Sequence, residues 1–314
     1  MQRLNQPVAS VAVVGEGAAA AALAGTARAA GIEVRAELTP LAALAAPVPP
    51  NVEKVLIAKS GLSREMLATL ALHYTAAGVA VWLERAELAE LQGLLPEEPT
   101  GDRPGVVLAA ARPLRRWRRV VDIAVAGTVL VVLLPLLLII AVLVRRSSPG
   151  GVFHRAEVVG QDGRPFTWYK FRTMRIGGRD EARRQERFAE FVAGGAAPTK
   201  IVEAARITPI GEVLRRHSLD ELPQLCSVLK GDMTLFGPRP CLLYEYELLK
   251  PWQRARFMVR PGLTGLWQVR GRGKVHADEM AFMDICYALG RTWRTDLRVL
   301  WETLLVVIGG RGAA

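Results

Sequence analysis

Apolar and polar positions follow a regular pattern over the first hundred residues of the chain. Short apolar runs, typical of buried strands, are separated by Ala-rich or amphipathic stretches of helical length. The predicted strands are Val8 to Val14, Ile32 to Leu38, Val55 to Ala58 and Val79 to Leu83, and the predicted helices are Ala18 to Ala30 and Arg64 to Ala77. This order predicts βαβ units around a parallel sheet, an α/β Rossmann-like domain over residues 1–105.

The turn after the first predicted strand carries a weak nucleotide-binding pattern. Gly15, Gly17 and Ala20 formally match G-x-G-x-x-A at a strand-to-helix junction. Glu16, however, would place a negative charge where a pyrophosphate needs free backbone N–H groups. We therefore expect a degenerate scaffold, with a working nucleotide site as the alternative. Leu95 to Gly105, rich in proline, glycine and acidic residues, is predicted to be a linker.

One long apolar run, Ile123 to Val144, holds 22 residues without a formal charge. At ~1.5 Å per residue it is long enough to cross a bilayer core of ~30 Å. A spanning helix carries its basic excess on one side, whereas here both flanks are basic. The flanking residues are Arg112, Arg115, Arg116, Arg118 and Arg119 before the run, and Arg145, Arg146, Arg155 and Lys170 after it. We expect a basic juxtamembrane segment over 106–119 and a re-entrant membrane helix over 120–146 that breaks at Pro135, with a straight span as the alternative.

The remaining residues, 147–314, mix strand and helix patterns and predict an α+β domain. Val152 to Met174 is expected to form a β-hairpin with a turn near Asp162. Within its second strand the period of two places Lys170 and Arg172 on one face, which can therefore hold a polyanion. The charged stretch Gly177 to Thr199 is expected to be a solvated helix and a loop.

Charge is distributed unevenly along the chain. The net charge is +11, with 8 basic and 11 acidic residues up to Ala110 but 33 basic and 19 acidic residues beyond it. The basic part favours phosphate-bearing partners, namely nucleotide-sugars, anionic lipids or nucleic acid, and nucleic acid ranks last because no recognisable module is present. Cys226, Cys241 and Cys286 lack the spacing of a zinc site or a disulfide framework, which favours a reducing compartment.

Two adjacent carboxylates, Asp220 and Glu221, stand at the predicted start of a short helix. Pro223 lies near the start of that helix and Gly231 just beyond its end. One explanation is purely structural, because Ser218-x-x-Glu221 is a capping box and acids in a first turn are favoured by the helix dipole. The alternative is that the two carboxylates take part in binding or catalysis.

The basic neighbourhood supports the chemical alternative. Two carboxylates near Arg215 and Arg239 can hold a divalent cation, with a diphosphate completing the ligand shell. Arg239 is the first choice for a phosphate clamp because guanidinium groups bind phosphate bidentately, and a turn arginine paired with a surface acid is its alternative. Lys170, Arg172 and Arg215 are further candidates for phosphate contact, each with a solvated position as its alternative.

Four motifs stand in order along the basic part of the chain. They are KFRTM (Lys170 to Met174), SLDELPQL (Ser218 to Leu225), LKGDMTLFGPRP (Leu229 to Pro240) and RPGLTGLWQVRGR (Arg260 to Arg272). Together with the apolar run, they resemble the bacterial sugar transferases, the monotopic polyprenyl-phosphate phosphoglycosyl transferases. The resemblance covers about Arg112 to Ala314.

The resemblance implies an enzyme of the inner membrane that transfers hexose-1-phosphate from a UDP-sugar to undecaprenyl phosphate and begins a polysaccharide repeat unit. Asp220 matches the nucleophile, which attacks the β-phosphate, releases UMP and holds the phosphosugar covalently. Glu221 matches its partner, and Mg²⁺ is expected on both carboxylates. The catalytic domain, 147–314, is then expected on the cytosolic face.

Tryptophans in segments that mix apolar and basic residues predict amphipathic helices lying in the membrane. Trp252, Trp293 and Trp301 are expected to dip into the bilayer. Trp267 fits either stacking on a base, an anchor at the headgroup level or a packed core. The rival to an enzyme is a catalytically silent membrane scaffold for a glycan-assembly complex. The identity of the sugar and the oligomeric state, a homodimer included, stay open.

Overall fold

The computed structural model describes residues 10–58, 61–84, 88, 91, 93–109, 116–177, 181–194, 206–270 and 275–308. Two compact units make up the chain. The first contains Met1–Arg112 together with Ile285–Thr295, and the second contains Pro113–Asp284 and Asp296–Ala314. The inclusion of a segment from near the C-terminus in the first unit had no signal in the sequence.

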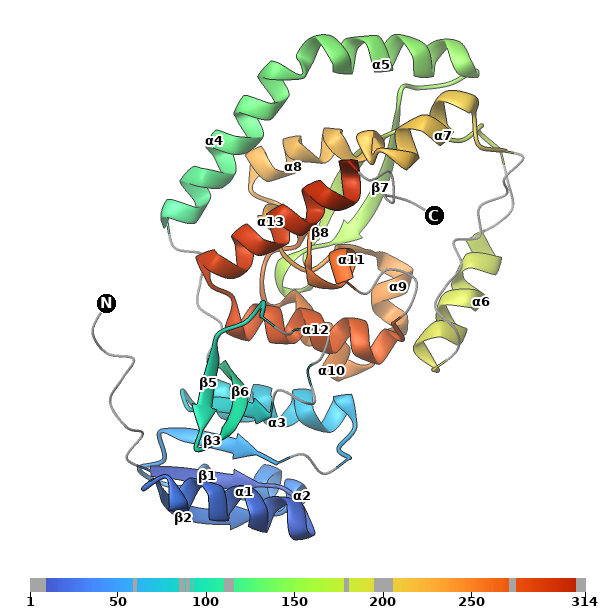
Figure 1. The fold of residues 1–314 in the computed structure, drawn as a ribbon. Helices are drawn as coiled ribbons and strands as arrows, with labels where there is room; N and C mark the ends of the chain where they lie inside the picture. Colours follow the sequence, from blue (N-terminus) through green and yellow to red (C-terminus); the bar gives the residue numbers. More distant parts are fainter. Residues whose placement is uncertain are drawn as a thin grey trace. The chain divides into compact units, whose positions relative to one another are not determined.

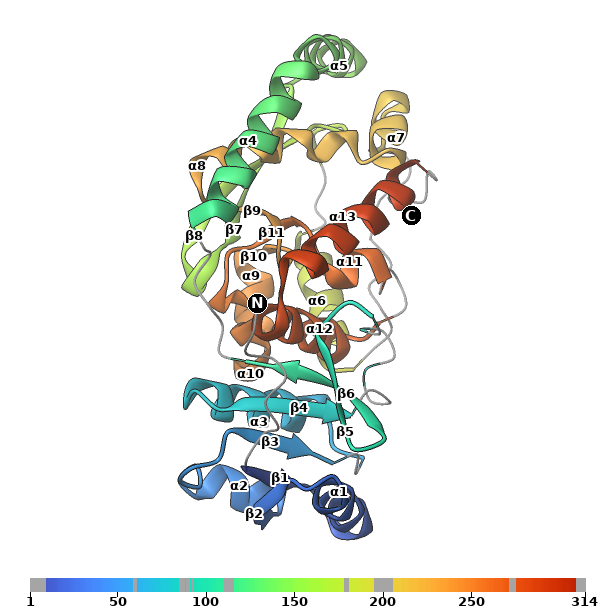
Figure 2. The same cartoon turned by 60° about the vertical axis from the view of Figure 1, so that its left-hand side comes forward.

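The first unit is built on one six-stranded sheet with the order β2-β1-β3-β4-β6-β5 (Figures 1 and 2). Its elements are β1 (Ser10–Val14), α1 (Gly17–Ala29), β2 (Glu33–Leu38), α2 (Pro40–Ala45), β3 (Lys54–Ile57), α3 (Arg64–Ala76), β4 (Ala80–Glu84), β5 (Glu97–Thr100) and β6 (Arg103–Leu108). The first four strands are parallel, as predicted. Their order, 2-1-3-4, is the one found in flavodoxin-like sheets, whereas Rossmann sheets have the order 3-2-1-4.

The core of this unit follows from the apolar runs that predicted the strands. Strand β1 is buried at every position, as a strand covered on both faces must be. Helix α1 packs its buried side, including Leu23 and Ala27, against Leu56 and Trp82 of the sheet. The crossover from β1 to β2 runs in one direction across the sheet, and the crossovers from β2 to β3 and from β3 to β4 run in the other. Because such crossovers are right-handed, α2 and α3 lie on the same face of the sheet. These two helices contact each other.

The predicted linker, Leu95 to Gly105, is wrong. Strands β5 and β6 form an antiparallel hairpin there, and β6 extends the sheet beside β4. Pro99 and Pro104 are paired in this hairpin, and β5 is the edge strand, where a missing N–H is tolerated. The Trp82 indole N–H donates to the Glu98 carbonyl at 2.9 Å and ties the hairpin to β4. Strand β6 also runs across the boundary expected at residue 105.

The glycine pattern after β1 has a packing role. A Cβ on Gly15 would lie 2.8 Å from the Ala58 Cβ and 3.2 Å from the Ala20 Cβ, so only glycine allows the strand and the helix to approach this closely. Gly17 begins α1 with a φ of +54°, and Glu16 makes no side-chain capping hydrogen bond. Close helix-to-strand packing therefore explains Gly15, and the positive φ explains Gly17.

The second unit surrounds two small sheets, β10-β7-β8 and β11-β9. Its elements are α4 (Arg116–Val132), α5 (Leu134–Ser147), β7 (Phe153–Val159), β8 (Pro165–Phe171), α6 (Glu181–Val192), α7 (Pro209–Arg216), α8 (Leu225–Lys230), β9 (Thr234–Phe236), β10 (Cys241–Leu242), α9 (Leu243–Leu248), α10 (Pro251–Arg254), β11 (Gly262–Thr264), α11 (Leu266–Arg270), α12 (Ala277–Gly290) and α13 (Trp293–Ile308). The 3-10 helices are η3 (Gln161–Gly163), η5 (Leu219–Gln224) and η6 (Ala255–Met258). Helices α12 and α13 each contribute residues to both units.

The apolar run is broken into two helices, α4 and α5, that meet at an angle of 63° (Figures 1 and 2). The break lies at Leu133, and Pro135 is the second residue of α5. Proline fits that position because the first N–H groups of a helix have no intrahelical partner. Among the described helices none alone has the length and apolarity of a membrane span, but this bent pair does when its two halves are taken together. Arg112 and Arg115 lie outside the described residues.

Polar side chains on α4 hold the bent pair to the rest of the unit. Arg119 donates to the carbonyls of Val228 at 2.5 Å and Leu229 at 2.7 Å, near the end of α8. Asp122 is buried, and its carboxylate accepts hydrogen bonds from the Thr234 hydroxyl at 2.8 Å and from the backbone N–H of Leu235 at 3.2 Å.

The outer faces of α4, α5 and α13 expose large apolar side chains. The exposed residues are Trp117, Val120, Val121, Ile123, Val125, Val131 and Val132 on α4, Leu134, Leu136, Leu138, Ile139, Val142 and Leu143 on α5, and Trp293, Leu297, Leu300, Trp301, Leu304 and Leu305 on α13. Monomeric soluble proteins rarely expose apolar surface on this scale. The expectation for Trp252 is wrong, because its side chain is 8% exposed and packs in the interior.

The predicted hairpin of the second unit is confirmed. Strands β7 and β8 are antiparallel, and the turn between them places Asp162 at a φ of +56°. Helix α6 is more than a solvated helix, because Phe191 and Val192 are buried in a core that also contains Leu249 and Phe257.

Candidate functional site

The backbone before the two carboxylates is held in an unusual conformation. Ser218 adopts the left-handed region at φ +54°, which costs a non-glycine residue of the order of 1 kcal/mol. Its side chain makes no capping hydrogen bond, so the capping-box explanation of Glu221 is wrong. Asp220 and Glu221 do lie in the first turn of a helix, the 3-10 helix η5, although Pro223 lies inside it and α8 begins only at Leu225. The predicted end is confirmed, because Gly231 directly follows α8. Strained backbone of this kind clusters at functional sites.

The Glu221 carboxylate is the meeting point of two cations. Lys170, on β8, places its ammonium group 2.8 Å from the Glu221 Oε1, and the Arg239 guanidinium lies 3.5 Å from the same atom. The three side chains are only 15% to 30% exposed. Two predicted phosphate contacts and one predicted catalytic residue, separated by up to 69 positions in the chain, therefore converge.

An aromatic ring lies under both cations. The Lys170 ammonium is 4.3 Å and the Arg239 guanidinium 5.7 Å from the ring centroid of Trp168, distances at which a cation is attracted to an indole face. Trp168 is 8% exposed. The sequence reasoning missed this residue, although Trp168 and Lys170 are two positions apart on one strand and so share a face.

Asp220 is the most perturbed carboxyl of the site. Burial, reinforced by the negative charge of Glu221, raises its pKa to about 6, while Lys170 and Arg215 act in the opposite direction. Arg215, in the last turn of α7, therefore stabilises the ionised form of Asp220. Burial also lowers the pKa of Lys170, although Glu221 raises it. A carboxyl with a pKa near 6 is more basic than an exposed one and is still ionised at neutral pH.

Arg172 has a different set of partners from the one expected. Strand β8 ends at Phe171, so the alternation that paired Arg172 with Lys170 stops there. The Arg172 side chain is buried, and its guanidinium donates to the carbonyls of Val144 at 3.2 Å, Ser148 at 2.7 Å and Pro149 at 2.8 Å. It thus satisfies carbonyl groups at the end of α5.

The turn that carries Arg239 is built from backbone packing. A Cβ on Gly237 would lie 2.5 Å from the Arg260 carbonyl oxygen, and a Cβ on Gly262 would lie 2.0 Å from the Gly237 nitrogen, so both positions require glycine. Strands β9 and β11 pair in parallel at this contact. The motifs GPRP and RPGLTG therefore form one structural unit.

A buried ion pair supports the same turn. The Arg256 guanidinium donates to the Arg239 carbonyl at 3.1 Å and lies 2.5 Å from the Asp284 carboxylate. Both side chains of the pair are at most 3% exposed. The sequence reasoning missed Arg256 and Asp284, because they are 28 positions apart and neither belongs to a local pattern. Trp267 is partly buried and packs against the aromatic core of this unit.

Asp220 and Glu221 form a carboxylate dyad, which supplies oxygen atoms of the kind that bind a divalent cation. Among the described residues no group of three His, Cys, Asp or Glu side chains is arranged to hold a metal ion. Mg²⁺ is commonly held by only one or two carboxylates together with substrate phosphates, and Asp220 and Glu221 supply two. They fit an ion that is bound jointly with a diphosphate.

Several known bacterial proteins are similar to this chain. The chain is similar to the UDP-galactose-lipid carrier transferase of Erwinia amylovora, with 37% identity over 63% of this chain and 42% of that protein. It is 35% identical to the Exopolysaccharide production protein ExoY of Rhizobium meliloti over 70% of this chain and 94% of the relative. It is also 35% identical to the UDP-glucose:undecaprenyl-phosphate glucose-1-phosphate transferase of Caulobacter vibrioides, over 73% and 85% of the two chains.

The shared part is the region that contains the dyad. The match to the Erwinia protein spans less than half of that relative's length. The Bacterial sugar transferase family matches residues 114–310, which include the bent helix pair, the dyad and the elements that carry Lys170 and Arg239. The chain therefore belongs to the bacterial sugar transferase family.

Proposed function

We propose that this protein transfers hexose-1-phosphate from a UDP-sugar to undecaprenyl phosphate and so starts a polysaccharide repeat unit. The observation that carries the proposal is the convergence of Lys170 and Arg239 on Glu221, next to the buried Asp220 on a strained turn. The names of two relatives contain UDP-galactose and UDP-glucose, which supports a hexose as the sugar.

The reaction proceeds in two displacements at the same phosphorus atom. A carboxylate oxygen of Asp220 attacks the β-phosphorus of the UDP-sugar, the bond from that phosphorus to the bridging oxygen breaks, and UMP leaves with the bonding electrons. A phosphate oxygen of the polyprenyl phosphate then attacks the phosphorus, and Asp220 leaves as a free carboxylate. Splitting the exchange lets donor and acceptor use one face in turn.

The cations around the dyad suit this chemistry. Negative charge develops on the phosphoryl oxygens, and fixed positive groups in a partly desolvated site stabilise it. Lys170 and Arg239 are already held in place by Glu221 and Trp168, so little reorganisation is needed. Asp220 and Glu221 would hold Mg²⁺ together with the diphosphate, and the ion would neutralise charge on the phosphate oxygens.

The bent pair α4–α5 is proposed to enter the membrane and return. Its exposed apolar faces, its 63° bend and the arginines at both ends support a re-entrant segment more than a straight span. The exposed tryptophans Trp293 and Trp301 on α13 suit the headgroup level of the same leaflet. This arrangement would keep the dyad on the cytosolic face, where nucleotide-sugars are found.

A labelling experiment tests the nucleophile. Purified protein is incubated with Mg²⁺ and UDP-glucose or UDP-galactose carrying a labelled β-phosphate, without acceptor. We expect release of UMP in stoichiometric amount and label that stays on the denatured protein. Asp220→Asn should lose both, with turnover reduced about a thousandfold or more, whereas Glu16→Gln in the first unit should retain both.

Two outcomes would count against the proposal. Label that remains on Asp220→Asn would show that another residue is the nucleophile. Failure of the wild-type protein to release UMP from any UDP-sugar, with or without polyprenyl phosphate, would instead favour the membrane scaffold.

A further inference from the structure

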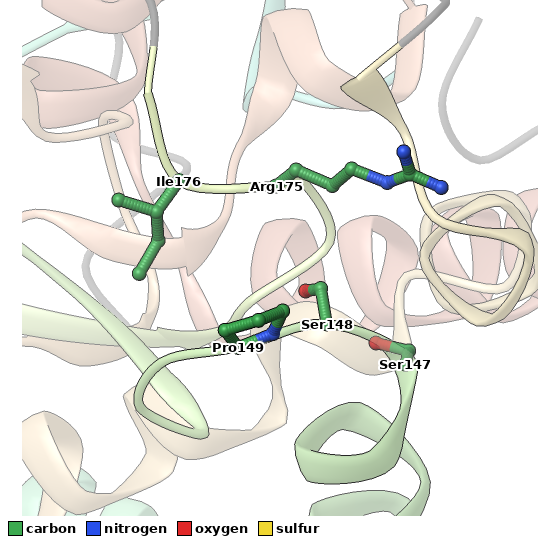
Figure 3. Close-up of a pocket in the computed structure, with 5 residues that line it drawn as sticks. All are labelled: Ser147, Ser148, Pro149, Arg175 and Ile176. Atoms are coloured by element: carbon green, nitrogen blue, oxygen red, sulfur yellow. The ribbon is translucent and has the colours of Figure 1, made fainter.

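A pocket of about 320 Å³ lies at the C-terminal end of α5, where the exposed apolar surface of the bent pair stops. It is lined by Ser147, Ser148, Pro149, Arg175 and Ile176 (Figure 3). None of these residues belongs to the site that contains Asp220 and Glu221. The pocket is therefore a feature that the transfer reaction leaves unexplained.

Arginines converge on the turn that forms the wall of this pocket. Arg172 donates to the carbonyls of Ser148 and Pro149, and Arg145 donates to the carbonyl of Gly150 at 2.5 Å. Arg175 lines the pocket itself. The turn is thus held by two guanidinium groups and faced by a third, while no acidic side chain is among the lining residues. The local potential is that of an anion site.

Two residues that line the pocket, Ser148 and Arg175, carry hydrogen-bonding groups. The Ser148 side chain is only 8% exposed, and its hydroxyl has no hydrogen-bond partner among the described residues. A buried hydroxyl without a partner is uncommon and calls for an explanation. The Arg175 side chain is exposed, and it extends over Ser147 and Ser148 (Figure 3). A guanidinium fork and a serine hydroxyl are the groups that bind phosphate in proteins.

The surroundings of the pocket favour a lipid over a free ion. Ile176 forms one edge of the pocket, and its side chain is 72% exposed. The last turn of α5 carries Arg145 and Arg146, which follow the exposed Val142 and Leu143 and the buried Val144. Basic residues that follow exposed apolar ones are typical of the boundary between acyl chains and headgroups. If α4 and α5 enter the membrane as proposed above, the pocket opens at the headgroup level.

We propose that this pocket binds the phosphate of an anionic phospholipid headgroup, with Arg175 and the Ser148 hydroxyl as its ligands. Its membrane placement rests on the proposed insertion of α4 and α5. The binding itself does not depend on the transfer reaction. A bound lipid would fix the end of the bent pair against the turn that Arg172 holds.

Titration of the full-length protein in detergent with dihexanoyl phosphatidylglycerol tests the proposal. Arg175→Ala should weaken binding about tenfold, because a charge-assisted bidentate contact is lost, and Ser148→Ala about threefold. Arg175→Lys should retain part of the affinity. Arg183→Ala, which removes an exposed arginine on α6 outside the pocket, should leave the affinity unchanged. Asp220→Asn should bind the lipid like wild type, which separates this proposal from the transfer mechanism.

Three results would overturn it. Equal weakening by Arg175→Ala and Arg183→Ala would mean that only overall charge matters. If inorganic phosphate bound as tightly as the lipid, the pocket would be a site for a free ion and not for a lipid headgroup. Competition between farnesyl phosphate and the phospholipid, with a raised KM for farnesyl phosphate in Arg175→Ala, would assign the pocket to the acceptor substrate instead.

Discussion

The two units of the chain each contain a partly buried lysine–glutamate pair, and the pairs differ in what surrounds them. Lys54 and Glu98 join β3 and β5 in the first unit, and Lys170 and Glu221 join β8 and η5 in the second. The lysines are similarly buried, at 12% and 15% exposure. Among the described residues only Glu221 has a second cation against it, from Arg239.

The comparison teaches that an ion pair alone does not mark a reactive site. In both pairs the glutamate carboxylate neutralises the charge of a partly buried lysine. Only the second adjoins a carboxyl whose pKa burial raises to about 6 and an aromatic ring under both cations. Convergence of several such perturbations distinguishes a catalytic site from a stabilising contact.

Among changes that test this comparison, the largest effect should come from removing the lysine of each pair. We expect Lys170→Met to reduce UMP release about a hundredfold, because one of the fixed positive groups that stabilise the phosphoryl charge is lost. Lys54→Met should leave the rate unchanged and lower the free energy of unfolding by about 1 kcal/mol. Steady-state kinetics and denaturant unfolding measure the two quantities, and Lys170→Arg should recover part of the rate. Equal rates in the two methionine variants would remove the distinction between the pairs.

A smaller effect is expected from pH. Because the pKa of Asp220 is raised to about 6 and only its ionised form can attack, kcat/KM should fall tenfold per pH unit below about pH 6. Arg215→Ala should move the midpoint upward, since Arg215 lowers this pKa. Glu98→Gln in the first unit should not move it. A profile that stays flat down to pH 5 would rule out Asp220 as the titrating group.

The smallest effect concerns the aromatic ring that only the second pair has. Trp168→Leu should reduce kcat/KM about fivefold, because the two cations lose the indole face on which they lie. Trp168→Phe should restore part of the loss, since a phenyl ring keeps a weaker version of the same attraction. A leucine variant as active as wild type would make Trp168 an ordinary core residue.

Local patterns predicted the elements of the first unit, but not their arrangement. Periodicity correctly located the four parallel strands and the helices α1 and α3, because buried strands and helices repeat over a few residues. Strand order depends on contacts between distant segments, so the 2-1-3-4 order was beyond reach. The β5–β6 hairpin was missed because Pro99 and Pro104 give it the composition of a linker.

The candidate site was predictable where motifs were dense. Asp220, Glu221, Lys170 and Arg239 were named from the sequence, and the structure brings the last three into contact. The capping box failed because a backbone in the left-handed region cannot be recognised from the identity of Ser218. Trp168 shares a strand face with Lys170 and was within reach of the same periodicity argument.

The hydrogen bonds of Arg119 and Asp122 bear on how this protein can be produced. Both residues lie in α4, and their partners are the end of α8 and strand β9. A shortened version that begins at the expected catalytic boundary, residue 147, would remove these hydrogen bonds and would expose Val228 and Met233, which are fully buried. Deleting the apolar helices to obtain a soluble enzyme should therefore yield a misfolded fragment, and extraction of the intact chain with detergent is the better route.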